Sequence, residues 1–261
     1  MKRALFIQHD HYSPSGLVGD AFATLGYDIT EVRVVPRERY RSPDVTVTFP
    51  DATAYDALVA FGAVWSVYDD AAIGSWVGDE IELTRTAIAA GVPVLGICFG
   101  GQMLATAVGG RVERAPSPEI GWTPITRTSS SPVLPPGPWF EWHYDRFLLP
   151  QGVPSLATTD LGGGEIASQA FTVGRSLGLQ FHPEVTEAVL GAWLYEGGSE
   201  ELATIGVDPT RMISETRAVA DDAATRAHEL VRRFVTDVAT RPVVARHDRV
   251  DRGCDKGHIY R

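Results

Sequence analysis

Cysteine is scarce in this chain, which has only Cys98 and Cys254 among its 261 residues. Two cysteines cannot build the disulfide framework of a small secreted domain, and a reducing compartment would keep both as thiols. Long apolar runs are also missing, since no stretch approaches the about 18 residues that span a bilayer. The first residues, Met1 to Gln8, show no signal-peptide pattern. We therefore expect a cytoplasmic protein without a membrane segment.

Positive charge is in short supply. The chain carries 23 Lys and Arg against 33 Asp and Glu, a formal net charge of -10 and a pI of about 5.1. No global basic field is available to attract nucleic acid or anionic lipid, so we expect neither partner. The 44% hydrophobic and 21% charged content is that of an ordinary globular protein with one large or two small domains.

Short apolar runs separated by turn signals predict an α/β fold. Buried strands are expected at Ala4–Gln8, Ile29–Val35, Ala57–Gly62 and Val92–Ile97, with a helix over Asp79–Ala90. Uninterrupted apolar strands alternating with helices are typical of a doubly wound, mostly parallel sheet with helices on both faces.

Beyond Gly110 the pattern changes to shorter, partly antiparallel strands, which predicts a small extension of the sheet. An apolar stripe then predicts a long helix over Pro209–Ala239, packed on the core or on a second subunit of a homo-oligomer. We divide the chain into a domain at 1–240 and a basic tail at 241–261.

A cysteine stands between two glycines in Gly96-Ile97-Cys98-Phe99-Gly100, directly after an expected strand. This is the Gly-x-nucleophile-x-Gly pattern of a sharp strand-to-helix turn, here with cysteine in place of serine. A thiol at a helix N-terminus is stabilised as the thiolate, the nucleophilic form. The alternative is an inert cysteine buried between sheet and helix.

A histidine and a glutamate flank a proline in Phe181-His182-Pro183-Glu184. Proline favours an extended chain, which places His182 and Glu184 on one side. The carboxylate can then orient the imidazole, which serves Cys98 as base and acid. The alternative is a surface turn with an incidental ion pair.

With these motifs in order, the sequence resembles the class I (triad) glutamine amidotransferases, and most of all stand-alone proteins similar to the amidotransferase domain of GMP synthase. The resemblance runs from about Ala4 to about Trp193. It rests on the two motifs above and on three further blocks, Glu119-Ile120-Gly121-Trp122, Trp142-His143-Tyr144-Asp145-Arg146-Phe147 and Ser168-Gln169-Ala170-Phe171. It implies a flavodoxin-like fold and a glutamine amidotransferase that needs no cofactor.

The resemblance also implies residue roles. Cys98 attacks the γ-amide of glutamine, and His182 and Glu184 complete the triad. The backbone amides of Phe99 and Ala63 hold the oxyanion. Ala63 and Val64 replace the second glycine and the proline that relatives usually have, and alanine resists a positive φ by about 1–2 kcal/mol. The oxyanion loop is therefore expected to be arranged differently or to align only when substrate binds.

Substrate contacts are implied for five residues: Gly62, Gln102, His143, Tyr144 and Asp145. Gln102 could instead face solvent, and the His143 block could be a structural turn. The run His9-Asp10-His11 lacks metal-ligand spacing, so we expect no metal.

Three functions remain open. The chain could supply ammonia to a separate synthetase, since it has no Gly-x-x-x-x-Gly-Lys phosphate loop of its own. It could be a stand-alone γ-glutamyl hydrolase or peptidase acting on a γ-glutamyl amide, peptide or polyamine. It could also be a weakly active regulatory or binding subunit.

Overall fold

A mixed eight-stranded sheet runs through this computed structural model, which describes residues 1–128 and 132–242. The order is β2-β1-β3-β4-β10-β9-β8-β6, parallel from β2 to β10 and antiparallel from β10 to β6. The bounds in that order are Tyr27–Arg33, Lys2–Gln8, Ala57–Ala60, Val94–Ile97, Ser176–Leu179, Glu165–Val173, Ser155–Gly162 and Thr126–Arg127. The predicted doubly wound, flavodoxin-like fold is confirmed.

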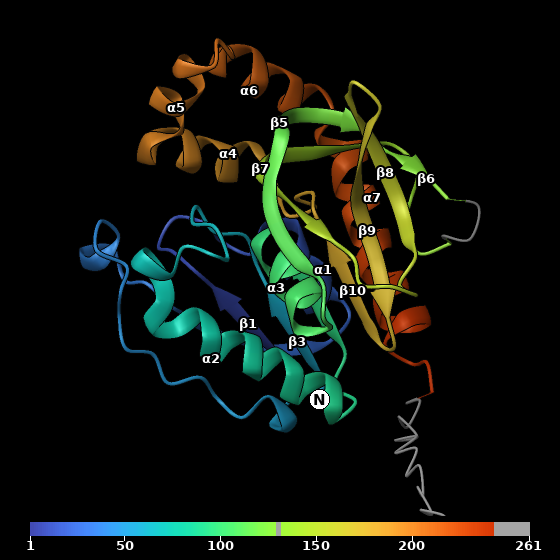
Figure 1. The fold of residues 1–261 in the computed structure, drawn as a ribbon. Coiled ribbons are helices and arrows are strands. Elements are labelled where there is room, and N and C mark those ends of the chain that lie inside the picture. The colour runs from blue at the N-terminus through green and yellow to red at the C-terminus, as the bar shows by residue number, and fades with distance from the viewer. Residues whose placement is uncertain (129–131, 243–261) are drawn as a thin grey trace, which may run out of the picture.

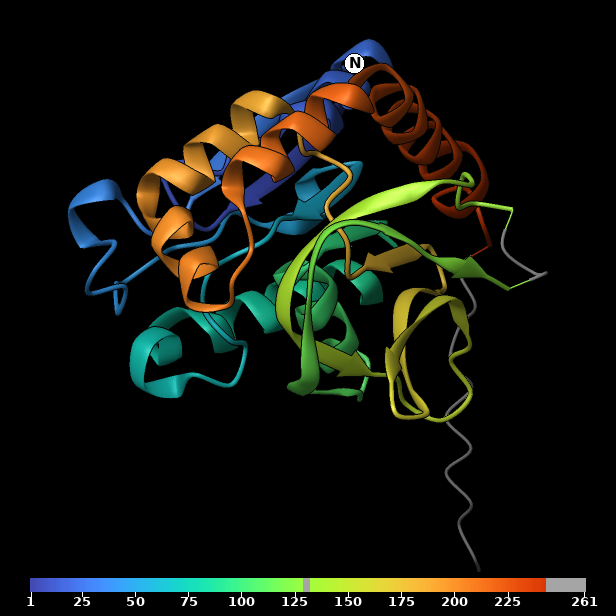
Figure 2. The same cartoon turned by 90° about the horizontal axis from the view of Figure 1, so that it is seen from above.

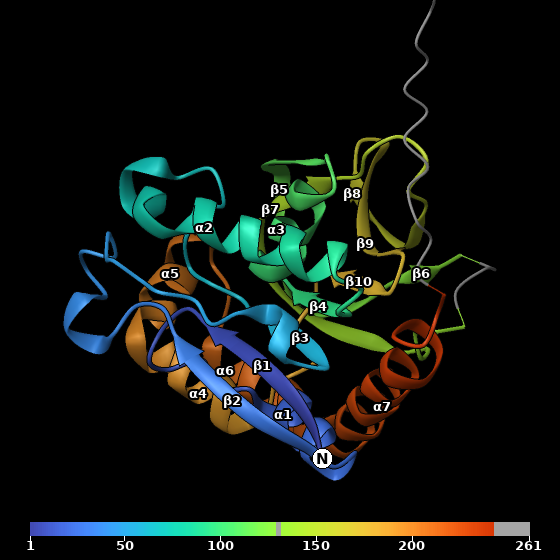
Figure 3. The same cartoon turned by 90° about the horizontal axis from the view of Figure 1, so that it is seen from below.

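Helices cover both faces of the sheet (Figures 1 and 3). On one face lie α2 (Asp70–Ala89) and α3 (Phe99–Ala107), and on the other lie α1 (Gly16–Thr24) and α7 (Ala220–Arg233). Strands β3, β4 and β10 are buried along their whole length, because each is covered from both sides. Their carboxyl ends therefore form one protected edge, where ligands usually bind in such folds.

Two helices differ from the sequence expectation. Helix α2 begins at Asp70 instead of Asp79, because the Asp69 side chain caps it by accepting a hydrogen bond from the Ala72 amide. The long helix expected over Pro209–Ala239 is two helices, α6 (Pro209–Ala218) and α7, separated at Val219 and followed by a π-helical turn at Phe234–Val238. The break lets α6 and α7 pack on different clusters of the core.

A second, two-stranded sheet pairs β5 (Arg111–Pro124) with β7 (Pro138–Leu148) in antiparallel fashion. Three short helices pack against it: α4 (Glu187–Trp193), α5 (Ser199–Thr204) and α6, with a π-helical turn at Leu194–Gly198. We call residues 187–218 the cap helices (Figure 2). They share one apolar cluster with β7, comprising Phe140, Val185, Val189, Leu190, Leu194, Leu202 and Met212.

None of the helices in the described part of the chain has the length and apolarity that a bilayer crossing requires. The predicted tail 241–261, apart from its first two residues, and Cys254 lie outside the described residues.

Candidate active site

Cys98 occupies the sharp turn between β4 and α3. Its φ of 50° is the only positive φ of a non-glycine residue in the described ranges. Both flanking residues are glycines because the surrounding backbone leaves no room for a Cβ atom. A Cβ on Gly96 would lie 2.4 Å from the Gly100 carbonyl oxygen, and one on Gly100 would lie 2.1 Å from the Ala60 oxygen. The strained backbone is thus held by close packing on both sides.

The Cys98 sulfur sits at the N-terminus of α3, and the residue is 5% exposed. The Gln180 side-chain amide donates to the sulfur at 3.8 Å. Phe99 is the first residue of α3, so its N–H has no partner within the helix and is available to an oxyanion.

His182 and Glu184 follow β10 and converge on the same point. The His182 amide donates to the Phe140 carbonyl at 2.8 Å, which fixes this segment against β7. Nδ1 of His182 lies 2.7 Å from the Glu184 carboxylate. Nε2 is buried and has no hydrogen-bond partner among the described residues, so it is free to act on a ligand.

The position of Gly62 shows that His182 and Cys98 flank one spot. A Cβ added to Gly62 would lie 2.9 Å from Cε1 of His182 and 3.7 Å from Cβ of Cys98. Burial alone would lower the pKa of His182, but the Glu184 carboxylate and the nearby Cys98 sulfur together raise it well above its ordinary value. The three side chains therefore form one electrostatically linked group.

The loop after β3 carries Gly62 and Ala63 past this group. Gly100 N–H donates to the Phe61 carbonyl at 3.1 Å, and Nδ1 of His9 donates to the Gly62 carbonyl at 3.0 Å. Ser66 and Tyr68 hold the far end of the loop by donating to the Asp145 carboxylate. Neither Gly62 nor Ala63 has a positive φ, so the alanine causes no backbone strain here.

His9, Asp10 and His11 point to separate partners. Nε2 of His9 lies 3.1 Å from the Glu80 carboxylate. Asp10 accepts from the amides of Tyr12 and Ser13, and His11 lies 3.3 Å from Glu196. No group of three potential metal ligands occurs in the described residues. The first histidine thus supports the loop at Gly62.

The buried His9 and Glu80 pair gives a stability prediction. Burial alone would lower the pKa of His9, but the Glu80 carboxylate raises it above its ordinary value, which favours a protonated ring. Glu80→Ala would remove this counter-charge and leave Nε2 of His9 buried without its partner. We expect a loss of about 3–5 kcal/mol in the free energy of unfolding, measured by urea denaturation. The exposed Glu82→Ala on the same helix is the control and should cost less than about 1 kcal/mol. Equal small losses would contradict the assignment.

A cavity of about 450 Å³ opens above Cys98 and His182. Such a volume lies in the range of small-molecule sites. Every residue for which the sequence predicted an oxyanion or substrate contact lines it: Gly62, Ala63, Phe99, Gln102, His143, Tyr144 and Asp145.

The structure decides between the alternative placements that the sequence allowed for Gln102 and for the His143 block. Gln102 is 3% exposed and does not face solvent; its side-chain nitrogen donates to the Asp145 carbonyl and to the Gln180 side chain, both at 3.4 Å. His143 lies in the regular strand β7 and not in a turn. Sequence reasoning assigned no role to Gln180, Ser66 or Tyr68, because their contacts with Cys98 and Asp145 join segments that are distant in the sequence.

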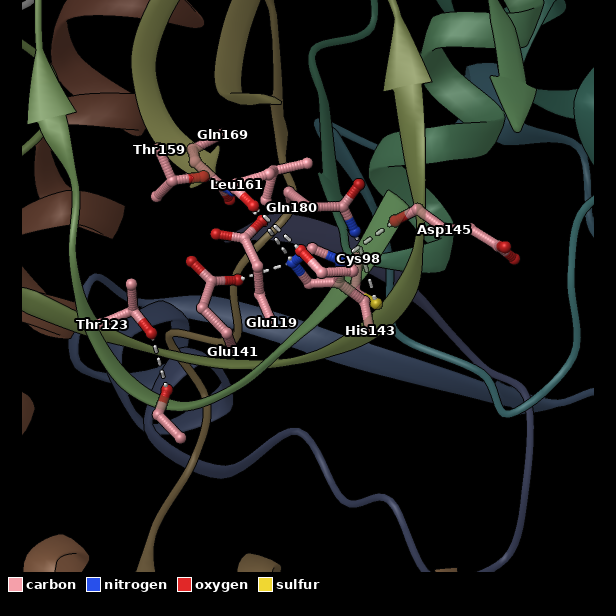
Figure 4. Close-up of polar contacts among 12 residues, drawn as sticks. Cys98, Glu119, Thr123, Glu141, His143, Asp145, Thr159, Leu161, Gln169 and Gln180 are labelled. Atoms are coloured by element: carbon pink, nitrogen blue, oxygen red, sulfur yellow. Dashed lines mark hydrogen bonds and ion pairs between the residues drawn. The ribbon is translucent and has the colours of Figure 1, made fainter. Parts of the chain in front are cut away.

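A buried polar network lies beside the Cys98 pocket (Figure 4). Nδ1 of His143 donates to the Asp145 carbonyl at 3.0 Å, so Nε2 of a neutral ring must accept. Nε2 lies 3.1 Å from Glu141 and 3.4 Å from Glu119. Burial lowers the pKa of His143 to about 4, while burial and the Glu119 charge raise the pKa of Glu141 well above its ordinary value. Glu141 is therefore the protonated donor to a neutral His143.

This protonation state predicts a pH-dependent stability. The folded protein retains the Glu141 proton above pH 4.5, the ordinary value, whereas the unfolded chain loses it. Stability therefore falls as pH rises towards the folded pKa. Glu141→Gln removes the titrating group and with it this pH dependence. As pH rises, the unfolding free energy of the variant should therefore increase relative to that of wild type by up to about 1.4 kcal/mol per pH unit. His143 is common to both proteins and its own titration largely cancels.

Urea denaturation of both proteins between pH 5 and 8 measures the difference. A variant that is less stable than wild type by the same amount at every pH would show that Glu141 is ionised in the folded state.

Comparisons with known proteins place these residues in a family context. The family model for class-I glutamine amidotransferases matches residues 20–197. A glutamine-hydrolysing GMP synthase of Aeropyrum pernix is 31% identical over 196 residues, 71% of this chain and 38% of that protein. The one of Thermus thermophilus is 37% identical over 151 residues, 54% of this chain and 27% of that protein. The chain thus spans less than two fifths of either enzyme.

Solved structures agree on the fold. A glutamine amidotransferase from Thermotoga maritima matches with a TM-score of 0.77 at 24% identity, over 90% of this chain and 98% of that one. A glutamine amidotransferase from Methylobacillus flagellatus matches with the same TM-score and identity, over 93% of this chain and 97% of that one. The extent of the family match, together with the fold, shows that this chain belongs to the class-I glutamine amidotransferase family.

Proposed function

We propose that Cys98 attacks the γ-amide carbon of glutamine or a close γ-glutamyl relative, forming a γ-glutamyl thioester and releasing the amine. The observation that carries the proposal is the 2.7 Å contact of Glu184 with Nδ1 of His182, which leaves Nε2 without a partner beside the Cys98 turn. This is the nucleophile, base and orienter arrangement of triad enzymes.

Each step uses a group in the pocket. His182 takes the thiol proton, and the thiolate adds to the carbonyl carbon. The amides of Phe99 and Ala63 would stabilise the oxyanion, an effect worth about 10²–10³ in rate per donor. His182 then gives its proton to the leaving nitrogen, and later activates the water that hydrolyses the thioester. Glu184 holds the ring and stabilises the imidazolium.

Ammonia released in this way would serve a separate synthetase. This part of the proposal draws on the relatives named as glutamine-hydrolysing GMP synthases, of which the chain covers only a fraction. We also propose that the protein works in the cytoplasm, where Cys98 would stay reduced.

A stand-alone γ-glutamyl hydrolase is the second candidate. The cap helices favour it, because Trp193, Glu196 and Glu201 from residues 187–218 line the pocket above Cys98. A site lined by the chain's own helices can bind the amine part of such a substrate without a partner protein.

Ammonia release from L-glutamine by the purified chain tests the proposal, with L-asparagine, one methylene shorter, as the control. We expect release from glutamine only. A slow rate that rises with a synthetase would favour the first candidate, and unaided turnover of an N-substituted γ-glutamyl amide would favour the second. Folded protein that releases glutamate from no γ-glutamyl compound would contradict both and leave the regulatory subunit.

A further inference from the structure

The pocket is larger and more acidic than the amide group of glutamine requires. Five carboxylate residues line it, against a single arginine, Arg114; the five are Asp10, Asp145, Glu184, Glu196 and Glu201. Most of these are already engaged. Asp145 faces Ser66, Tyr68 and, at 3.9 Å, Arg114.

Two more carboxylates have cationic neighbours, and a third caps a loop. Glu184 pairs with His182. Glu196 lies 3.3 Å from His11 and 3.6 Å from the mostly exposed Arg37. Asp10 accepts from backbone amides of its own loop.

Glu201 is different, because no cation lies within ion-pair distance of it in the described part of the chain. It accepts a hydrogen bond from the Trp142 indole at 3.0 Å. Burial and the Glu201 carboxylate raise the pKa of Tyr144 to about 12, so this neighbour of Glu201 is neutral. A half-buried carboxylate held by neutral groups still has an uncompensated charge.

A continuous aromatic wall joins the candidate acid of the reaction to this carboxylate. The His182 ring packs edge-on against Trp193, with centroids 4.9 Å apart. Trp193 packs edge-on against Trp142 at 6.0 Å, and Trp142 contacts Glu201. Aromatic faces and carboxylates together are the groups that bind alkylammonium ions.

We propose that this wall binds the amine portion of an N-substituted γ-glutamyl amide whose leaving group is a linear diamine with a distal ammonium at Glu201. The inference rests on the proposed function and specifies its substrate class. His182 protonates the leaving nitrogen, so the amine begins at the imidazole, and its methylene chain lies along Trp193 and Trp142. The unpartnered, buried Nε2 of His182 marks the point where the scissile nitrogen sits.

The reaction balances without a further reactant. The Cys98 thiolate forms the C–S bond as the C–N bond breaks, and the amine leaves with a proton from His182. Water then adds to the thioester carbon and gives a proton to His182, the C–S bond breaks, and the Cys98 thiolate is regenerated; glutamate and the free diamine are the products. No oxidant or nucleotide is consumed.

Matched substrates test the inference. N-(γ-glutamyl)-1,4-diaminobutane and the 1,5-diaminopentane amide are each compared with the uncharged alkylamide in which a methyl group replaces the ammonium. We expect kcat/KM to favour at least one charged amide over its uncharged partner by about tenfold or more. Glu201→Gln should bring this ratio close to one. Glu200→Gln, an exposed neighbour on α5, is the control for lost charge and should keep the wild-type ratio.

The ratio of kcat/KM for the charged and the uncharged amide is taken within each variant. General damage to the fold lowers both values and therefore cancels in the ratio. Calorimetry with Cys98→Ala measures binding of the same four amides without turnover, and the charged amides should bind more tightly by a similar factor.

The outcomes separate the two claims. Equal cleavage and equal binding of charged and uncharged amides by an active enzyme would overturn the diamine inference and leave the proposed function standing. No cleavage of glutamine or any amide, with tighter binding of the charged amides to Cys98→Ala, would overturn the proposed function and support the pocket assignment. Failure in both assays would overturn both.

Discussion

Replacing Cys98 with alanine is expected to lower the rate of glutamate release from a γ-glutamyl amide by about 10⁶-fold, the scale of a lost nucleophile in a triad enzyme. The reason is that Cys98 supplies the only thiol among the described residues that line the pocket. The side chain is small and 5% exposed, and the strained turn is fixed by Gly96 and Gly100, so the fold should survive the change. Release is measured with a coupled glutamate assay.

The control for this variant is Cys254→Ala, which removes the chain's other thiol. It should keep the wild-type rate. A Cys98→Ala protein that binds substrate and still releases glutamate within tenfold of wild type would show that a different group carries the reaction.

Replacing Glu184 with glutamine is expected to lower kcat by about 10⁴-fold while the protein stays folded. The amide is close in shape to the carboxylate but can donate to Nδ1 of His182, which favours the wrong tautomer of the ring and fails to stabilise the imidazolium. Loss of the Glu184 charge also removes the main group that raises the pKa of His182, so the pH dependence of the residual activity should shift to lower pH.

Steady-state kinetics and a pH profile of the variant measure both effects. Glu187→Gln, an exposed residue that pairs with Arg217, is the control and should leave kcat unchanged. A Glu184→Gln enzyme with nearly normal kcat would mean that Cys98 and His182 act as a dyad.

The fold was largely predictable from the sequence, because its central strands are buried on both sides and read as uninterrupted apolar runs. β1, β3 and β4 lie where those runs occur. The strands beyond Gly110 could be expected only in general terms, since a segment such as β8, Ser155–Gly162, mixes threonines with apolar residues and is partly exposed. The break at Val219 was missed, because the apolar stripe continues through it and only tertiary packing separates α6 from α7.

The positions of the candidate site residues followed from motifs whose spacing has a steric cause. Gly96, Gly100 and Pro183 constrain the backbone locally, so Cys98, His182 and Glu184 could be identified from the amino-acid sequence alone. The supporting residues could not. His9 and Glu80 are 71 positions apart, and His143 needs Glu119 from a neighbouring strand. Such pairs depend on the topology, which no local pattern encodes.

The most direct measurement of the central claim is mass spectrometry of the protein after treatment with a diazoketone analogue of glutamine, which traps a thiol that recognises the γ-glutamyl group. The account predicts one adduct, on the peptide that contains Cys98, blocked by excess glutamine and formed far more slowly in the Glu184→Gln variant. Labelling that is equal on Cys98 and Cys254, or that glutamine does not slow, would contradict it.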